Sequence, residues 1–132
     1  MTSVLLDTHV VLWVLDDDPR LGTSARQLLE AASDRWVSAA SLWEIGTKAE
    51  LGKLKVPADV PQRIAAAGLS WLNIGPEHAW GVRTVAGLPH RDPFDRLLLS
   101  QAVTTSATLL TADEQILEAK LTPDVDRRDA RL

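Results

Sequence analysis

At 132 residues, the chain is most simply one domain, long enough to bury about two-thirds of the surface that it exposes when unfolded. It has no cysteine, which excludes disulfides, thiolate metal sites and cysteine nucleophiles. The net charge of −4 argues against a general nucleic-acid-binding surface, because phosphate contacts need Lys and Arg, although two bound divalent cations would cancel that charge.

Neither a membrane span nor a secretion signal is evident. No uninterrupted apolar run approaches the roughly 18 residues of a membrane span. Residues 1–3 place no positive charge ahead of the first apolar segment, as a signal peptide would. We therefore expect a cytoplasmic protein that does not associate with membranes.

The first half of the chain alternates short apolar runs with helical patterns. Residues 4–6 predict a buried strand, and residues 9–15, apolar almost all round, predict a helix covered on most sides. Apolar residues at helical spacing predict a second helix over 24–32. A short strand at 36–37 and a helix over about 42–51 follow.

The second half continues this alternation. We expect helices over about 60–67, 76–86, 93–103 and 112–119, and strands over 71–74 and 107–110. The tail from about residue 122 is mostly charged and has no predicted structure. Strands alternating with helices indicate βα units, so the predicted fold class is α/β: one domain over residues 1–132, with a central, mostly parallel sheet of four or five strands flanked by helices.

Four acidic residues each lie where a predicted strand or loop gives way to a predicted helix: Asp7, Glu44, Asp95 and Asp113. In parallel α/β sheets the working residues lie beyond the carboxyl ends of the strands, so these acids can meet only in the folded protein. Clustered carboxylates repel one another unless cations lie among them, and oxygen ligands suit Mg²⁺ or Mn²⁺ rather than zinc. The resulting hypothesis is metal-dependent phosphodiester chemistry.

Helix capping is a simpler explanation for two of these acids. Glu44 would complete a capping box with Ser41. Glu114 would complete another with Thr111, which leaves Asp113 in the favourable first turn of its helix. Capping and metal binding are compatible, because helix N-termini favour ionised carboxylates.

The other acids fit helix starts less completely. Asp92 is typical of an N-cap, Pro93 of a first helical position and Asp95 of a first-turn acid. Capping alone does not explain two acids in one turn, nor does it require Asp7, since Thr8 could cap the first helix.

Four segments of the chain form an ordered set: residues 4–9 (VLLDTH), 38–45 (SAASLWEI), 90–98 (HRDPFDRLL) and 110–113 (LTAD). Together they resemble the motifs of PIN-domain ribonucleases, most nearly the VapC-type toxins of bacterial toxin–antitoxin pairs. The resemblance covers roughly residues 3–118, and its most specific part is the run DPFDRLL over residues 92–98.

The resemblance implies a PIN-like domain that cleaves RNA endonucleolytically with Mg²⁺ or Mn²⁺ as its cofactor. It places the metal-binding and catalytic acids at Asp7, Glu44, Asp95 and Asp113. Asp7 and Asp95 are expected as primary ligands, while Glu44 and Asp113 would hold a second ion or orient and deprotonate the attacking water. Asp92 is either a further metal ligand or an N-cap only.

The resemblance also implies partners. The protein would be the toxin of a type II toxin–antitoxin system, held inactive by a cognate antitoxin, as a homodimer or a larger hetero-oligomer with that antitoxin. The alternative is a catalytically inactive PIN-like module that only binds RNA or protein. Such a module would be expected to have lost at least one acid, and all four are present.

Several further side chains are candidates for substrate or partner contacts. Trp13 and Trp43 lie near acid-bearing segments and suit a partner groove or base stacking, whereas His9 is expected to be a packed core residue. A basic cluster could follow an RNA backbone, and two arginines flank the acids of one motif, although ordinary surface positions explain both sets: Lys48, Lys53 and Lys55, then Arg91 and Arg96.

Overall fold

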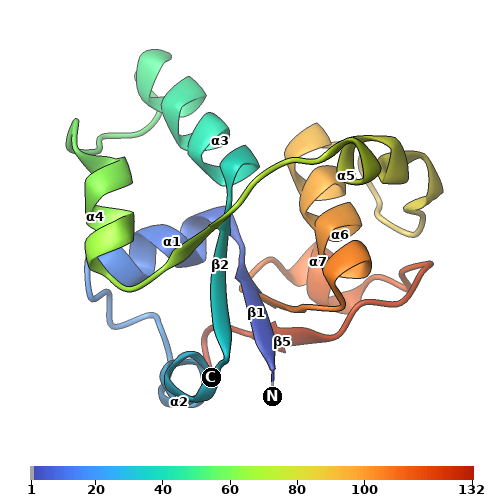
Figure 1. Ribbon diagram of the computed structural model, residues 1–132, viewed down its shortest axis with the longest axis horizontal. Coiled ribbons are helices and arrows are strands. Elements are labelled where there is room, and N and C mark those ends of the chain that lie inside the picture. The colour runs from blue at the N-terminus through green and yellow to red at the C-terminus, as the bar shows by residue number, and fades with distance from the viewer. Residues whose placement is uncertain (1) are drawn as a thin grey trace.

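A five-stranded sheet forms the centre of the protein in a computed structural model that describes residues 2–132 (Figure 1). The strands are β1 (Ser3–Leu6), β2 (Asp34–Ser38), β3 (Ser70–Leu72), β4 (Thr108–Thr111) and β5 (Arg127–Asp129). They lie in the order β3-β2-β1-β4-β5, and each neighbouring pair is parallel. The predicted α/β class and parallel sheet are confirmed, with five strands.

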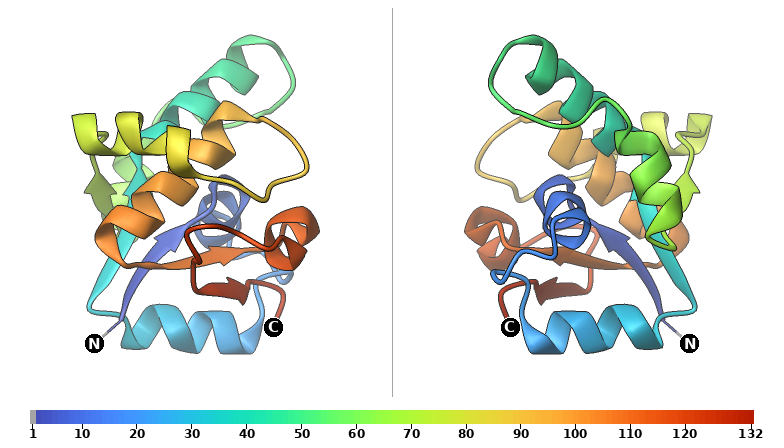
Figure 2. Two further views of the ribbon diagram at one scale, coloured as in Figure 1. Left: turned by 90° about the vertical axis from the view of Figure 1, so that its right-hand side faces the viewer. Right: turned by 90° about the vertical axis from the view of Figure 1, so that its left-hand side faces the viewer.

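Helices cover both faces of this sheet. They are α1 (Thr8–Leu15), α2 (Thr23–Ala31), α3 (Ala39–Glu50), α4 (Val60–Ala66), α5 (Pro76–Gly81), the 3₁₀ turn η1 (Val82–Thr84), α6 (Pro93–Thr105) and α7 (Glu114–Glu118). Helices α1, α2 and α4 pack on one face and α6 and α7 on the other, while α3 projects beyond the sheet in both views of Figure 2. Within residues 2–132, no helix combines the length and apolarity needed to cross a membrane.

The central strands are buried on both faces, which explains their continuous apolar sequence. Side chains alternate across the sheet, so Val4 and Leu6 contribute to the core under α1 and α4, while Leu5 contributes to the core under α6. Leu110 and Leu109 of β4 divide between the two cores in the same way. Together these strands form a rigid base whose carboxyl ends lie at one edge.

The charged tail forms the fifth strand, which the sequence left unassigned. Arg127 explains how so polar a segment is held, because its Nη1 donates to the carbonyls of Ile116 at 2.7 Å and Ala119 at 2.6 Å. These are orphan carbonyls at the end of α7, which basic side chains commonly satisfy. The backbone nitrogen of Ala130 then donates to the carbonyl of Thr111 and joins β5 to β4.

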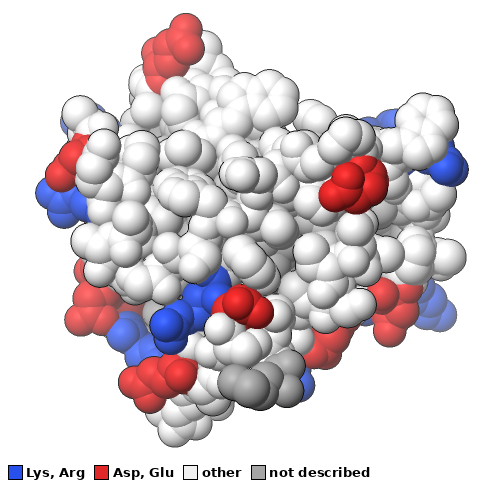
Figure 3. Space-filling model, in the orientation of Figure 1, with Lys and Arg blue, Asp and Glu red and all other residues white. Residues whose placement is uncertain are grey.

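Most predicted boundaries differ from the observed ones by only a few residues. The largest differences are at the start of α3, which lies at Ala39 rather than near Leu42, and at the end of α5, which lies at Gly81 and continues as the turn η1. Figure 3 views the face that carries β3, the edge strand, and its acidic side chains lie apart from one another, mainly toward the rim. Acidic residues therefore do not gather on that face.

Candidate active site

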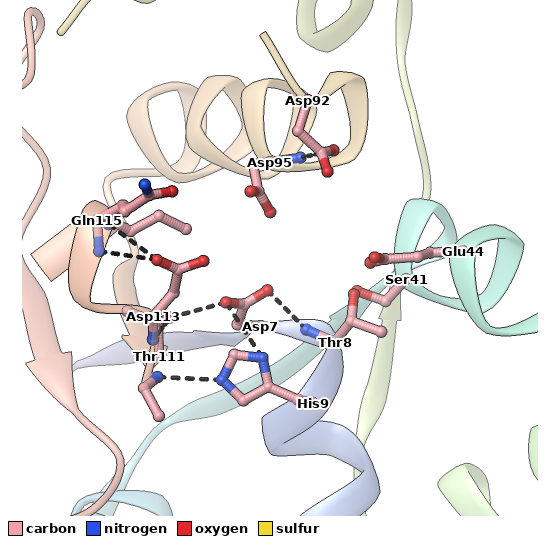
Figure 4. A network of polar contacts seen from close by, with 12 residues as sticks. Asp7, Thr8, His9, Ser41, Glu44, Asp92, Asp95, Thr111, Asp113 and Gln115 are labelled. Atoms are coloured by element: carbon pink, nitrogen blue, oxygen red, sulfur yellow. Dashed lines mark hydrogen bonds and ion pairs between the residues drawn. The ribbon is translucent and has the colours of Figure 1, made fainter. Parts of the chain in front are cut away.

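A cleft of about 380 Å³ lies beyond the carboxyl ends of the central strands. Its walls are the starts of α1, α6 and α7 together with the second turn of α3. All five acids singled out in the sequence line it: Asp7, Glu44, Asp92, Asp95 and Asp113. Figure 4 shows Asp95 reaching from α6 toward Asp7, with Asp113 and Glu44 on opposite sides of them.

Asp7 is held firmly at the end of β1. Its backbone nitrogen donates to the carbonyl of Leu110, its Oδ1 accepts from the backbone nitrogen of Thr8 at 2.8 Å, and its Oδ2 accepts from the hydroxyl of Thr111 at 2.7 Å. Asp7 is thus the N-cap of α1, and the expectation that Thr8 could take this role is wrong. The hydroxyl of Thr8 donates to Ser41 instead.

The Asp7 side chain is almost fully buried, at 5% exposure. Burial raises the pKa of this carboxyl, while the nearby His9 and the hydrogen bonds from Thr111 and Thr8 act in the opposite direction. Ionised Asp7 is therefore costly in this position unless further positive charge lies close to it.

Asp95 lies in the first turn of α6 and is held much less tightly. Its carboxylate accepts no hydrogen bond from the residues that the structure describes, and Nε2 of His90 lies 3.5 Å from its Oδ2. Burial raises the pKa of Asp95 to about 7, and the charges of Asp7, Asp92, Asp113 and Glu44 add to the effect in that order. A cation beside this side chain would therefore offset both its burial and the repulsion from its neighbours.

Glu44 does not cap a helix. Helix α3 begins with Ser38 as its N-cap, whose Oγ accepts from the backbone nitrogen of Ala40, so the predicted capping box between Ser41 and Glu44 is wrong. The Glu44 side chain is buried at the cleft, where its Oε2 lies 2.7 Å from Nζ of Lys48. That hydrogen bond is the main reason why the pKa of Lys48 is raised.

Asp113 is the N-cap of α7, so the predicted capping box between Thr111 and Glu114 is also wrong. Its Oδ1 accepts from the backbone nitrogen of Gln115 at 2.8 Å. Thr111 is the last residue of β4, and its hydroxyl accepts from the backbone nitrogen of Asp113 while donating to Asp7. Asp113 is thereby fixed to the same sheet edge as Asp7, as Figure 4 shows.

Asp92 forms the N-cap that the sequence predicts, with Pro93 at the first helical position and Asp95 in the first turn. Its Oδ1 accepts from the backbone nitrogens of Phe94 at 2.9 Å and Asp95 at 3.2 Å. One carboxylate oxygen is therefore committed to the helix start. A metal-binding role for Asp92 stays a prediction.

The donor set of the cleft is suited to a hard divalent cation. Its ligand groups are carboxylate oxygens from four elements. The negative charges of the other four acids all raise the pKa of Asp95. Within residues 2–132, however, no group of three or more His, Asp or Glu side chains closes on a single metal position. The fit is therefore to a cation held by one or two carboxylates and completed by water, as is common for Mg²⁺.

His9 belongs to the cleft, so the expectation of a packed core residue is wrong. Its side chain is 39% exposed and its Nδ1 lies 3.7 Å from Oδ2 of Asp7. Its Nε2 accepts from the backbone nitrogen of Ala112 at 3.2 Å, so the proton of the neutral ring lies on Nδ1, facing Asp7. The apolar helix around His9 gave no signal of this contact, which joins residues more than a hundred positions apart.

The basic candidates divide between the cleft and other surfaces. Lys48 and Lys53 line the cleft, whereas Lys55 lines a separate pocket beside α4. Arg91 and Arg96 line a pocket on the outer side of α6, and Nη2 of Arg96 donates to the carbonyl of Val82 at 2.6 Å. Only the first two lysines therefore lie beside the acids.

Comparison with known sequences gives a consistent result. The family described as PIN domain matches residues 4–121. The chain is also 32% identical over 126 residues to ribonuclease VapC22 of Mycobacterium tuberculosis (strain ATCC 25618 / H37Rv), a match that covers 88% of this chain and 91% of that protein.

Solved structures share the fold at low sequence identity. The crystal structure of VapBC2 from Rickettsia felis, bound to a DNA fragment from the promoter, contains a chain that matches with a TM-score of 0.70 at 14% identity over 97% of this chain and 98% of that one. The DNA-bound VapBC of Salmonella typhimurium matches with a TM-score of 0.66 at 15% identity, over 98% of each chain. At this level of identity, the likeness establishes the fold.

Proposed function

The chain belongs to the PIN-domain family, and from this premise we propose that it is a divalent-metal-dependent endoribonuclease, the toxin of a type II toxin–antitoxin pair. The single observation that carries the proposal is the cleft in which Asp7, Glu44, Asp95 and Asp113 meet from four different elements. The similarity to a protein named as a ribonuclease supports RNA as the substrate.

Asp7 and Asp95 are the proposed primary ligands of Mg²⁺ or Mn²⁺. A bound cation of this kind would lower the pKa of an attacking water and neutralise the charge that develops on the phosphate. Asp7 supplies a preorganised oxygen, because Thr8 and Thr111 hold both of its carboxylate oxygens in place. Asp95 supplies a carboxylate that is free to adjust, and a cation beside it would favour its ionised form by offsetting the charge of Asp7.

Glu44 and Asp113 complete the proposed site from its two sides. Glu44 has no capping role, so its carboxylate is available to hold a second cation or to accept the proton of the attacking water. Its partner Lys48 would lie close to the charge of the substrate phosphate. Asp113 uses Oδ1 to cap α7, which leaves Oδ2 available in the cleft. Like Glu44, it could hold a second cation or accept the proton of the attacking water.

A cognate antitoxin is the proposed inhibitor, with the toxin present as a homodimer or a larger hetero-oligomer with it. The support is that the similar solved chains come from VapBC complexes. Exposed aromatic surface next to the site gives such a partner a place to bind, since Trp43 is 62% exposed and packs edge-on against Phe94 at the start of α6.

The test is RNA cleavage by purified protein freed of any bound partner, with Mg²⁺ or Mn²⁺ supplied. Chelator should abolish cleavage, and Asp7→Asn and Asp95→Asn should each lower kcat by about 100-fold or more. The matched control is Asp124→Asn, which removes an exposed carboxylate outside the cleft and should leave the rate unchanged.

Equal cleavage by the Asp7 and Asp95 variants would overturn the proposed site. Tight RNA binding without cleavage under any divalent cation would instead favour the inactive binding module. Inhibition of the active protein by the product of a neighbouring small gene would support the toxin assignment.

A further inference from the structure

We propose that a second pocket, which adjoins the acidic cleft, binds one nucleobase of a single-stranded RNA next to the scissile phosphate. This flanking pocket has a volume of about 550 Å³ and is lined by His9, Trp13, Pro19, Arg20, Ala112 and Arg131. The inference rests on the proposed ribonuclease function and deepens it by naming a substrate subsite.

The flanking pocket and the cleft lie on either side of one shared lining residue, His9. This ring lines both spaces, with Nδ1 facing the Oδ2 of Asp7 and Nε2 accepting from the backbone nitrogen of Ala112. Figure 4 shows His9 beside Asp7 and Thr111, on the floor of the site. A nucleotide whose phosphate lies among the acids would therefore have its base, or that of its neighbour, within reach of the pocket.

The walls of the flanking pocket present flat groups. The rings of His9 and Trp13 meet edge to face with their centroids 5.5 Å apart, and the guanidinium of Arg20 lies 5.1 Å from the centroid of the Trp13 ring. Stacking on aromatic rings and on arginine planes is how proteins commonly hold unpaired bases. A volume of this size also lies within the usual range for small-ligand pockets.

The charges of the flanking pocket favour a base over a phosphate. Arg20 is already paired with Asp18 through two contacts, at 3.1 and 2.7 Å. Arg131 is paired with Asp129 at 2.9 and 2.8 Å and with Glu114 at 3.1 Å. Because each guanidinium is neutralised and held in one orientation, the pocket offers flat polar walls with little net positive charge.

The acidic cleft itself also has basic side chains in its lining. Lys48 and Lys53 line it, on the side where Lys48 pairs with Glu44. Lys53 forms no ion pair with the residues that the structure describes, so it suits the sugar–phosphate backbone. The strand would run from it, across the acids, to the base held beside Trp13. Recognition of base identity would then be concentrated in the flanking pocket.

The test is an abasic scan of a short single-stranded RNA that the wild type cuts at one site. Removing the base at one position next to the cut should raise KM about 10-fold, the size expected for one stacked base. Trp13→Ala should raise KM by a similar factor for the intact RNA. In this variant, removing the base at that one position should not raise KM further, while abasic sites at the other positions should act as they do in the wild type. Arg20→Ala, at an exposed side chain, should give a smaller loss of about threefold at the same position.

The matched control is Trp80→Ala. Trp80 is 69% exposed and also carries an arginine over its ring, Arg83 at 4.7 Å, but it lies on α5 away from both pockets. Its removal should leave the abasic profile unchanged. Because Trp13 also packs against the core, Trp13→Phe serves as a second variant that keeps the ring and most of the effect.

Binding of the same RNAs to the protein is also measured in the presence of chelator, as a Kd from fluorescence anisotropy. Cleavage is then prevented, and the subsite is tested by binding alone. An abasic effect of equal size in the wild type and in Trp13→Ala at every position would overturn the subsite while leaving the ribonuclease intact. Failure of the wild type to cut any RNA would count against the proposed function, and the binding profile would still decide the subsite. A Trp13 variant that loses its protein inhibitor but keeps the wild-type abasic profile would mark the pocket as a protein contact and overturn the proposal.

Discussion

The two sides of the cleft hold their acids in different ways. On the side of the sheet, Asp7 is buried and both of its carboxylate oxygens accept hydrogen bonds, from Thr8 and Thr111. On the side of α6, Asp95 accepts none from the described residues, and the nearest ring nitrogen is 3.5 Å away on His90. Both pKa values are raised, chiefly by burial, but only Asp7 has hydrogen bonds that lower its own.

The fold itself needs the carboxylate of Asp7 but not that of Asp95. The Asp7 carboxylate starts α1 and ties it to β4, so the fold requires an oxygen acceptor there whether or not a cation binds. Nothing in the fold requires a carboxylate at position 95, where the ionised form is opposed by four neighbouring acids. Asp95 is therefore the position at which the binding of a cation should be most visible.

The largest expected effect concerns two acids of the same helix turn. Asp95→Asn should weaken Mn²⁺ binding by about 100-fold or more, since it removes a proposed ligand. Asp92→Asn should weaken it by about 10-fold at most, because Oδ1 of Asp92 already accepts two backbone hydrogen bonds. Titration calorimetry on partner-free protein measures both, and equal losses would make Asp92 a ligand of the same rank.

The second effect is on the pH dependence of stability without metal. The pKa of Asp95 is about 7 in the folded protein against an ordinary value of 3.8, so the folded state holds this proton more tightly. The stabilisation is complete at low pH, where the carboxyl is protonated in both states. It is lost as the pH rises toward 7, because the unfolded carboxyl ionises freely while the folded one still holds its proton. After allowance for partial solvation, we expect a loss of about 2 kcal/mol.

Urea unfolding of the wild type and of Asp95→Asn between about pH 5 and pH 8 isolates this contribution, because Asn does not titrate. The variant should gain stability relative to the wild type as the pH rises. Saturating Mg²⁺ should remove the difference by stabilising only the wild type. Parallel pH curves for the two proteins would contradict the assignment of the raised pKa to Asp95.

The third effect compares Ala with Asn at the two positions, in chelator. At position 7, Ala should be less stable than Asn by about 1.5 kcal/mol, because Asn keeps an acceptor for Thr8 and Ala leaves Thr111 without one. At position 95 the two variants should agree within about 0.5 kcal/mol, since no hydrogen bond is lost. Thermal or urea unfolding measures the differences, and a large gap at position 95 would mean that its carboxylate has a structural partner.

Local patterns in the sequence were enough to predict what depends on neighbouring residues. The order of strands and helices follows from apolar runs and helical spacing, and the N-cap at Asp92 follows from the residues just after it. The gathering of the acids was also foreseen, because parallel strands end at one edge and the acids follow those ends. Their function as ligands stays a prediction.

Features that depend on distant residues were missed. His9 looked apolar in its surroundings, yet its place is decided by the backbone of Ala112 and the carboxylate of Asp7. The strand β5 has no apolar alternation, because it is a short edge strand held by the contacts of Arg127 with α7. The capping box at Glu44 failed because Ser38, at the end of β2, caps α3 before Ser41 can.

The smallest expected effect concerns Asp92, the acid on α6 whose carboxylate accepts hydrogen bonds from the fold as that of Asp7 does. Asp92→Ala should destabilise the protein by about 1 kcal/mol and Asp92→Asn by a few tenths, because Asn is an equally good N-cap. Neither change should alter the stabilisation that saturating Mg²⁺ provides, if the cap is the whole role of Asp92. Unfolding curves with and without Mg²⁺ separate the two contributions. A variant that keeps its stability but is no longer stabilised by Mg²⁺ would make Asp92 a ligand of the cation. Accepting hydrogen bonds from the fold would then no longer separate the acids that only cap helices from those that bind the cation.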